Sequence, residues 1–188
     1  MSPPTPLRPD ASVRASVEKL CDRHGEGVVV ETCVALLAGA PPEDHSEIAR
    51  GLSAHDATVE ELRAKGWRDY WWRTWGARGL LYAWSDTAAP AVVDGLADPH
   101  WRPAEMCLKV AAAREVAEAA GGAVLLAGHR LARVRAAAVR TLGLVGDTEH
   151  VPEVRSALAD TDLQVRRAAV LAMERMVERL DLPEEELP

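Results

Sequence analysis

A 31-residue sequence repeat constrains this chain more than any other feature. The pair Val134-Arg135 recurs as Val165-Arg166, one period later, and Trp72-Arg73 lies two periods before the first pair. Asp98 and Asp160 are also two periods apart. Recurrence at a fixed short period indicates stacked supersecondary units rather than one closed core. The repeat therefore predicts architecture more directly than function.

Composition narrows the class of protein. Hydrophobic residues make up 48% of the chain, which is enough for a sizeable core, and the formal net charge is −7. Such a charge argues against wholesale binding to nucleic acid or membranes, although a local basic patch could still bind them. The three cysteines form no C-x-x-C pair, which favours reduced thiols. No apolar run approaches the roughly 20 residues that span a bilayer. We expect a cytoplasmic protein with no membrane segment.

Helical periodicity and turn signals place the elements. Alternation of β-branched residues is absent, so we expect an all-α fold. The predicted long helices from residue 67 onward are 69–84, 101–117, 131–144 and 163–180, with shorter helices at 88–96, 120–128 and 149–158.

The same signals suggest a division into four segments. Residues 1–9 are Pro-rich and read as a disordered leader. No 31-residue register is visible in residues 10–66, which form either an N-terminal helical cap or degenerate repeats. Residues 67–181 carry the repeats, and residues 182–188 form an acidic tail that keeps the exposed end soluble.

One stretch carries a family resemblance. Residues 133–143 read RVRAAAVRTLG and lead into Gly146-Asp147, then VPEV at 151–154 and ALAD at 157–160. This pattern resembles the HEAT repeat, in the short bacterial form also called the phycobilisome-lyase-type repeat. The resemblance is strong over residues 131–173 and moderate over 67–118. It implies a right-handed α-solenoid of HEAT-like helix pairs with an N-terminal helical cap.

The resemblance also implies a structural ladder between neighbouring repeats. In HEAT proteins the turn aspartate commonly pairs with the arginine of the Val-Arg pair. Carried over residue by residue, the ladder consists of Arg73, Asp98, Arg135, Asp160 and Arg166. Pro103-Ala104 stands where the other repeats have Val-Arg or Trp-Arg, so the ladder is interrupted there.

Helix geometry separates a core face from an opposite face on the long helices. At about 100° per residue, Arg133, Ala136, Arg140 and Gly143 fall within one arc opposite the core. The long helices correspond to the second helix of each HEAT repeat, and in HEAT solenoids that helix lines the inner surface. Shifting the arc by whole repeat periods gives a predicted partner-binding stripe that contains Trp71, Arg78, Arg102, Glu105, Lys109, Arg133, Arg140 and Arg167.

The stripe favours a non-catalytic scaffold that binds a partner protein, one with an acidic segment, on the inner face. Nucleic-acid binding through the same cations is the leading alternative. A solvated helix face with no partner is also compatible with the pattern. The clustered rings Trp67, Tyr70, Trp71, Trp72 and Trp75 fit either a buried seam or an aromatic wall for a ligand.

No motif for catalysis, a metal or a cofactor is evident, so we expect no cofactor and no enzyme activity. The six histidines form no H-E-x-x-H motif and no zinc-like spacing. His100 and His129 are expected to act as turn caps. A HEAT-like DNA glycosylase remains a remote possibility, with Trp71 at the lesion and Asp69 or Glu105 as the carboxylate. A bilin lyase role would rest on the shared repeat name alone.

Overall fold

A computed structural model describes residues 10–53, 55 and 57–183. The expected leader at 1–9 and residues 184–188 of the expected acidic tail lie outside this range. The described residues form helices and turns without any strand, so the fold is all-α, as predicted. The α-helices are α1 (Asp10–His24), α2 (Glu26–Leu37), α3 (Ser46–Ser53), α4 (Val59–Ala64), α5 (Asp69–Gly79), α6 (Ala89–Gly95), α7 (Trp101–Arg114), α8 (Ala120–Ala127), α9 (Ala132–Val145), α10 (Val151–Ala157) and α11 (Leu163–Leu180).

Two of the predicted long helices are shorter than expected. Helix α5 ends at Gly79 rather than residue 84, because the chain tightens into a turn in which the Tyr82 N–H donates to the Gly79 carbonyl at 2.9 Å. Helix α7 ends at Arg114 rather than residue 117, because Glu115 adopts a left-handed conformation with φ 53°. A residue in that conformation terminates an α-helix.

The chain divides into two compact units, which we call unit 1 (Met1–Gly95) and unit 2 (Leu96–Pro188). In unit 1, α5 packs against α2 and α3, and α1 packs against α2 and α3. The boundary between the units lies at Gly95 and Leu96, and the start of the repeats at residue 67 stays a prediction. The core of unit 1 contains fully buried side chains from four helices, among them Val17, Leu36, Leu52, Trp72 and Trp75.

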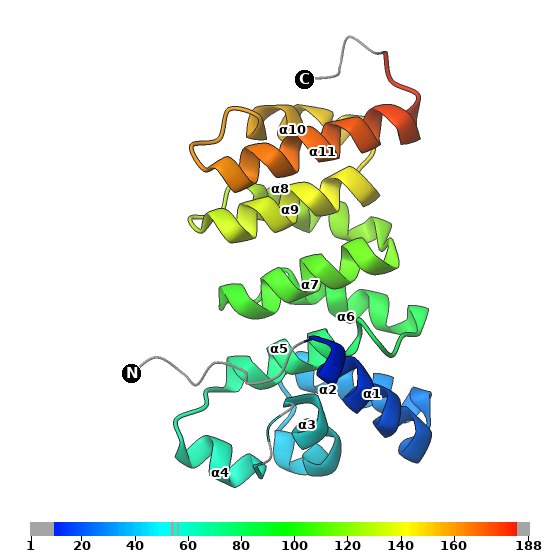
Figure 1. Cartoon of the computed structure of the whole chain (residues 1–188), viewed down its shortest axis with the longest axis vertical. Coiled ribbons are helices and arrows are strands. Elements are labelled where there is room, and N and C mark those ends of the chain that lie inside the picture. The colour runs from blue at the N-terminus through cyan, green and yellow to red at the C-terminus, as the bar shows by residue number, and fades with distance from the viewer. Residues whose placement is uncertain (1–9, 54, 56, 184–188) are drawn as a thin grey trace. The chain divides into compact units, whose positions relative to one another are not determined.

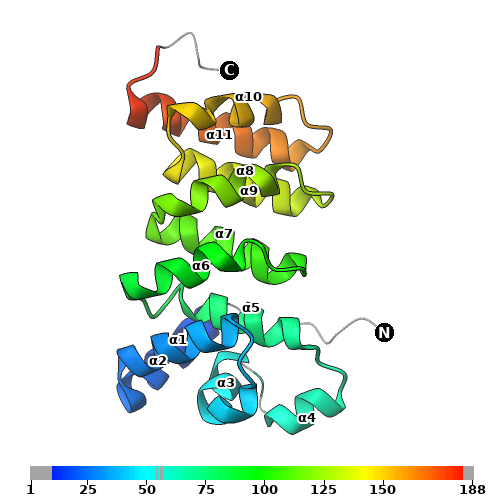
Figure 2. The same ribbon diagram turned by 180° about the vertical axis from the view of Figure 1, so that it is seen from behind.

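Unit 2 is built of two layers of helices. Helices α7, α9 and α11 lie side by side in that order, and the shorter α8 and α10 cover their other face (Figures 1 and 2). The buried Thr141 hydroxyl, 3.0 Å from the Leu108 carbonyl oxygen, links α9 to α7. On the other side α9 meets α11 closely, since a Cβ at Gly143 would lie 2.7 Å from the Cα of Ala172. The three long helices are thus held in fixed register.

No helix within the described ranges combines the length and the apolar character that crossing a membrane requires.

Candidate binding surface

Six of the predicted stripe residues come together on the long helices of unit 2. Helix α7 carries Arg102, Glu105 and Lys109, helix α9 carries Arg133 and Arg140, and helix α11 carries Arg167. These six residues are called the basic surface below. Because α7, α9 and α11 lie side by side, these helices bring five cations and one carboxylate to the same unit.

Glu105 is the centre of the best-ordered part of the basic surface. Its side chain is only 9% exposed, and its carboxylate lies 2.8 Å from Arg133 Nη2 and 3.0 Å from Lys109 Nζ. A buried carboxylate is expensive unless it is paired and hydrogen-bonded, and two cations satisfy it here. Arg133 and Lys109 remain 59% and 44% exposed. They therefore hold Glu105 while still facing solvent.

Trp101 joins the same cluster, and sequence reasoning missed it. The guanidinium carbons of Arg102 and Arg133 lie 4.3 and 4.7 Å from the centre of its ring, within cation–π range. In the 31-residue register Trp101 corresponds to Ala132, which falls about 20° outside the arc used to define the stripe. A helical wheel gives only the direction of each residue from the helix axis. It does not show that a large ring at the edge of the arc can still reach the surface.

Arg140 and Arg167 differ from the other cations of the basic surface. Both are exposed, and neither side chain has a hydrogen-bond or ion-pair partner within the described part of the chain. Leu171, one turn after Arg167 on α11, is 50% exposed. These two arginines can therefore accept an external anion without first giving up an internal contact.

Two members of the predicted arc on α9 are buried, which corrects their expected exposure. Ala136 is 1% exposed, and Gly143 packs directly against Ala172. The helix wheel treats α9 as covered on one side only, whereas α7 and α11 also cover its flanks. Only Arg133 and Arg140, which lie together at one end of the arc, are exposed.

Trp71 was expected on the exposed stripe, and this placement is wrong. The ring is 9% exposed and lies in the core of unit 1, with ring centres 5.4 Å from Trp67 and 6.2 Å from Trp75. Helix α5 packs into other helices, so its predicted inner face is covered. Arg78, the other stripe residue on α5, stacks over Trp75 at 5.0 Å. The aromatic cluster is thus a core rather than a wall for a ligand.

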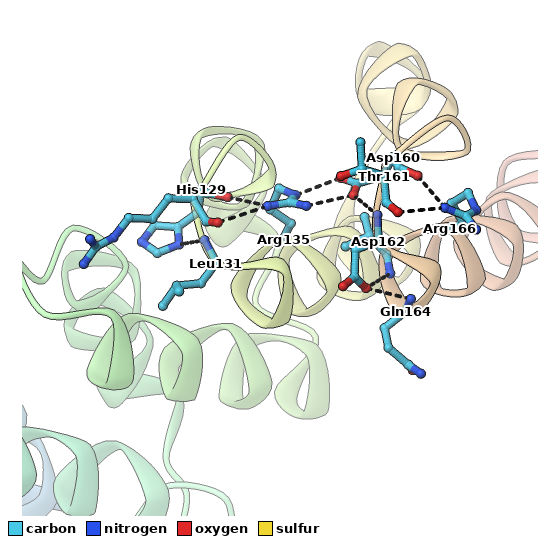
Figure 3. A network of polar contacts seen from close by, with 10 residues as sticks. His129, Leu131, Arg135, Asp160, Thr161, Asp162, Gln164 and Arg166 are labelled. Atoms are coloured by element: carbon cyan, nitrogen blue, oxygen red, sulfur yellow. Dashed lines mark hydrogen bonds and ion pairs between the residues drawn. The ribbon is translucent and has the colours of Figure 1, made fainter. Parts of the chain in front are cut away.

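The predicted ladder brings Arg135 and Asp160 together (Figure 3). Arg135 Nε and Nη2 donate to the two carboxylate oxygens of Asp160, each at 2.7 Å. These hydrogen bonds raise the pKa of Arg135 and lower the pKa of Asp160. A bidentate pair of this kind fixes both distance and orientation. It ties α9 to the turn that precedes α11.

The hydrogen bonds around the turns follow the 31-residue period. Arg135 Nη1 donates to the carbonyls of His129 and Arg130, and Arg166 Nη1 donates to the equivalent carbonyls of Asp160 and Thr161 (Figure 3). Asp98 and Asp160, which are two periods apart, each accept a hydrogen bond from the N–H two residues later. Arg73, the remaining ladder residue, lies on α5 in unit 1 and borders a cavity there.

The predicted role of the histidines is confirmed. His100 Nδ1 accepts from the Arg102 N–H at 3.3 Å, and His129 Nδ1 accepts from the Leu131 N–H at 3.0 Å. Both rings therefore hold the turns before α7 and α9. Among the residues that the structure describes, no group of three or more His, Cys, Asp or Glu side chains could hold a metal ion.

Part of the chain is similar to a known protein family. Residues 123–185 match the family model of HEAT repeats. That segment covers α9, α10 and α11, and with them Arg135, Asp160 and the Arg140 and Arg167 side of the basic surface. No curated protein matches the chain. The repeated hydrogen bonds, the stacked helix pairs and the family match together identify residues 123–185 as HEAT repeats.

Proposed function

We propose that unit 2 binds an acidic segment of a partner protein on the basic surface, as a scaffold without catalytic activity. The observation that carries the proposal is that adjacent helices bear five cations and a single carboxylate, which two of those cations already pair, in a chain whose net charge is −7. Opposite charge steers a partner toward such a surface and selects against basic ones. HEAT repeats generally mediate protein–protein interactions.

The two halves of the surface have different roles in this proposal. Three of the cations already have contacts within the protein. Arg102 stacks on Trp101, and Glu105 pairs with both Lys109 and Arg133. Arg140 and Arg167 have no such contacts among the described residues and supply the charges that meet the partner. The exposed Leu171 adds an apolar contact beside Arg167. We also propose that the helix pairs of unit 2 form turns of a right-handed solenoid. A capping role for residues 10–66 remains a prediction.

The surface supports a glycosylase less well. Trp71, the ring that this alternative needs at a lesion, is buried. Asp69 is paired with Arg63 at 3.0 Å, and Glu105 is paired with two cations. Both candidate carboxylates thus already have partners. Binding to a phosphate backbone would use the same cations as the protein-binding proposal, and direct comparison of an acidic peptide with duplex DNA separates the two.

The test uses fluorescence anisotropy with the full chain and a short labelled peptide rich in Glu and Leu. Its counterpart carries Gln at every Glu. We expect binding of the acidic peptide only, and a loss of about tenfold or more in affinity, ~1.4 kcal/mol, for Arg140→Glu/Arg167→Glu. The matched control Lys65→Glu/Arg68→Glu makes the same charge change in unit 1 and should bind as wild type. Equal losses in both variants would contradict a local site.

Mixed-sequence duplex DNA serves as the second probe in the same assay. DNA binding that falls steeply with salt, together with no binding of the acidic peptide, would replace the protein partner with nucleic acid. Binding of neither probe to wild-type protein at low salt would overturn the functional reading of the basic surface.

A further inference from the structure

A second basic site lies in unit 1, between α1 and α3, on helices that contribute nothing to the basic surface. One face of α1 contributes Ser16, Lys19, Leu20 and Arg23, and α3 contributes Glu47, Arg50 and Gly51. Together they line a cavity of about 170 Å³. A Cβ on Gly51 would lie only 2.9 Å from Leu20 Cδ1, so the two helices meet closely at the floor.

The charges around this cavity are unbalanced. Arg23 Nη1 lies 2.6 Å from Glu47 Oε1, and this hydrogen bond lowers the pKa of Glu47. The only carboxylate in the lining is therefore ionised and already paired. Lys19 and Arg50 have no side-chain hydrogen bond or ion pair with any described residue. Three cations and one carboxylate leave the lining with a net charge of +2.

A neighbouring cavity provides a contrast. It shares Glu47 and Arg50 with the first but adds Glu60, together with the hydroxyls of Ser46 and Thr58. Two carboxylates against one guanidinium leave that lining with a net charge of −1. An anion would be repelled there and attracted on the Lys19 side of Arg50. The asymmetry assigns the first cavity, and not the second, to an anionic ligand.

We propose that the cavity between α1 and α3 binds a phosphate monoester group. The Lys19 ammonium and the Arg50 guanidinium would neutralise the dianion, and the Ser16 hydroxyl would donate a further hydrogen bond. Arg23 would remain paired with Glu47 at one side of the cavity. The cavity has room for a phosphate group and opens to solvent. Any organic part of the ligand would extend into solvent.

The first experiment locates the ligand in the wild-type protein. Sodium phosphate, and in parallel O-phosphoserine, is titrated into the full chain at constant ionic strength while amide NMR shifts are followed. We expect saturable shifts at Ser16 and Gly51, which line the cavity. Absence of saturable shifts, or shifts spread over all exposed cations, would overturn the proposal. A response to O-phosphoserine alone would identify the group as part of a larger molecule, whereas a response to both would identify phosphate itself as sufficient.

The second experiment measures affinity in variants. Lys19→Gln/Arg50→Gln should weaken phosphate binding about tenfold or more, which corresponds to ~1.4 kcal/mol. Lys65→Gln/Arg68→Gln removes the same charge from exposed positions elsewhere in unit 1 and should leave the affinity unchanged. Equal weakening in both variants would show general charge screening and contradict the site. The conservative Arg50→Lys variant should retain part of the affinity.

Discussion

Arg135 on α9 donates two hydrogen bonds of 2.7 Å each to the carboxylate of Asp160, which lies in the turn before α11. The same arginine also donates to the carbonyls of its own turn at His129 and Arg130. One side chain thus joins two consecutive turns of the repeat. Arg166 makes the equivalent contacts to its own turn. The 31-residue period in the sequence is therefore also a period in hydrogen bonding.

Removing the carboxylate of this pair should destabilise unit 2. We expect Asp160→Ala to lower the free energy of unfolding by about 1–3 kcal/mol, because Arg135 loses a charged, largely buried partner. Chemical denaturation monitored by circular dichroism measures the change. Arg135→Lys keeps the charge but not the paired geometry, and it should lose part of the same stability. An unfolding midpoint for Asp160→Ala equal to that of wild type would show that the pair of Arg135 and Asp160 does not stabilise unit 2.

The contribution of Asp160 should depend on pH. Arg135 holds the pKa of this carboxyl below its ordinary value. A group with a lowered folded-state pKa stabilises the fold above its unfolded pKa, and this contribution is lost as the pH falls through the folded pKa. The stability difference between wild type and Asp160→Asn should therefore be complete at neutral pH and shrink below about pH 4. The exposed Asp94→Asn variant is the control and should show little difference at either pH. A wild-type advantage that persists undiminished in strong acid would contradict the pairing.

Close contact between α9 and α11 makes Gly143 sensitive to substitution. A Cβ there would lie 2.7 Å from both the Cα and the Cβ of Ala172, and backbone cannot move aside cheaply. Gly143→Ala should cost about 1–3 kcal/mol of stability. Gly121→Ala in α8, whose Cβ would meet nothing within 4 Å, should be neutral or stabilising by up to about 1 kcal/mol. Thermal unfolding measures the melting temperatures of both variants. Equal melting temperatures would contradict the close contact between α9 and α11.

Glu105 should compete with an acidic partner for the cations that it holds. In Glu105→Gln, Arg133 and Lys109 lose their ion pairs but remain solvated, since both are substantially exposed. We expect a higher affinity for the acidic peptide, with a change in stability within about 1 kcal/mol. Anisotropy and thermal unfolding on the same samples measure both quantities. Weaker peptide binding by the folded variant would show that Glu105 positions Arg133 for the partner rather than competing with it.

The sequence predicts the helices of unit 2 well for identifiable reasons. Asp, Gly and Pro at the turns mark the helix ends, so α11 spans the predicted residues 163–180, and α9 differs by one residue at each end. Exposure is predicted less well. The wheel assigns Ala136, Gly143 and Trp71 to an open face, but neighbouring helices cover all three. A helical wheel treats each helix in isolation, whereas the burial of a residue depends on which other helices pack against the sides of its helix.

The sequence also does not predict which residues pair with the charged side chains. The six cations of the predicted stripe look equivalent in a helical register. Only the structure distinguishes Arg133, paired with Glu105, from Arg140, which has no partner among the described residues. Trp101 was missed because its position falls just outside the predicted arc, although its ring lies under the guanidinium groups of Arg102 and Arg133.

A charge exchange across the basic surface tests the central claim most directly. The Arg140→Glu/Arg167→Glu variant is titrated with the acidic peptide and with a counterpart that carries Lys at every Glu, and wild type is titrated with both. We expect wild type to bind only the acidic peptide, and the variant to lose binding of that peptide and to gain binding of the basic one. A folded variant that still binds the acidic peptide with wild-type affinity would show that Arg140 and Arg167 do not form the binding site.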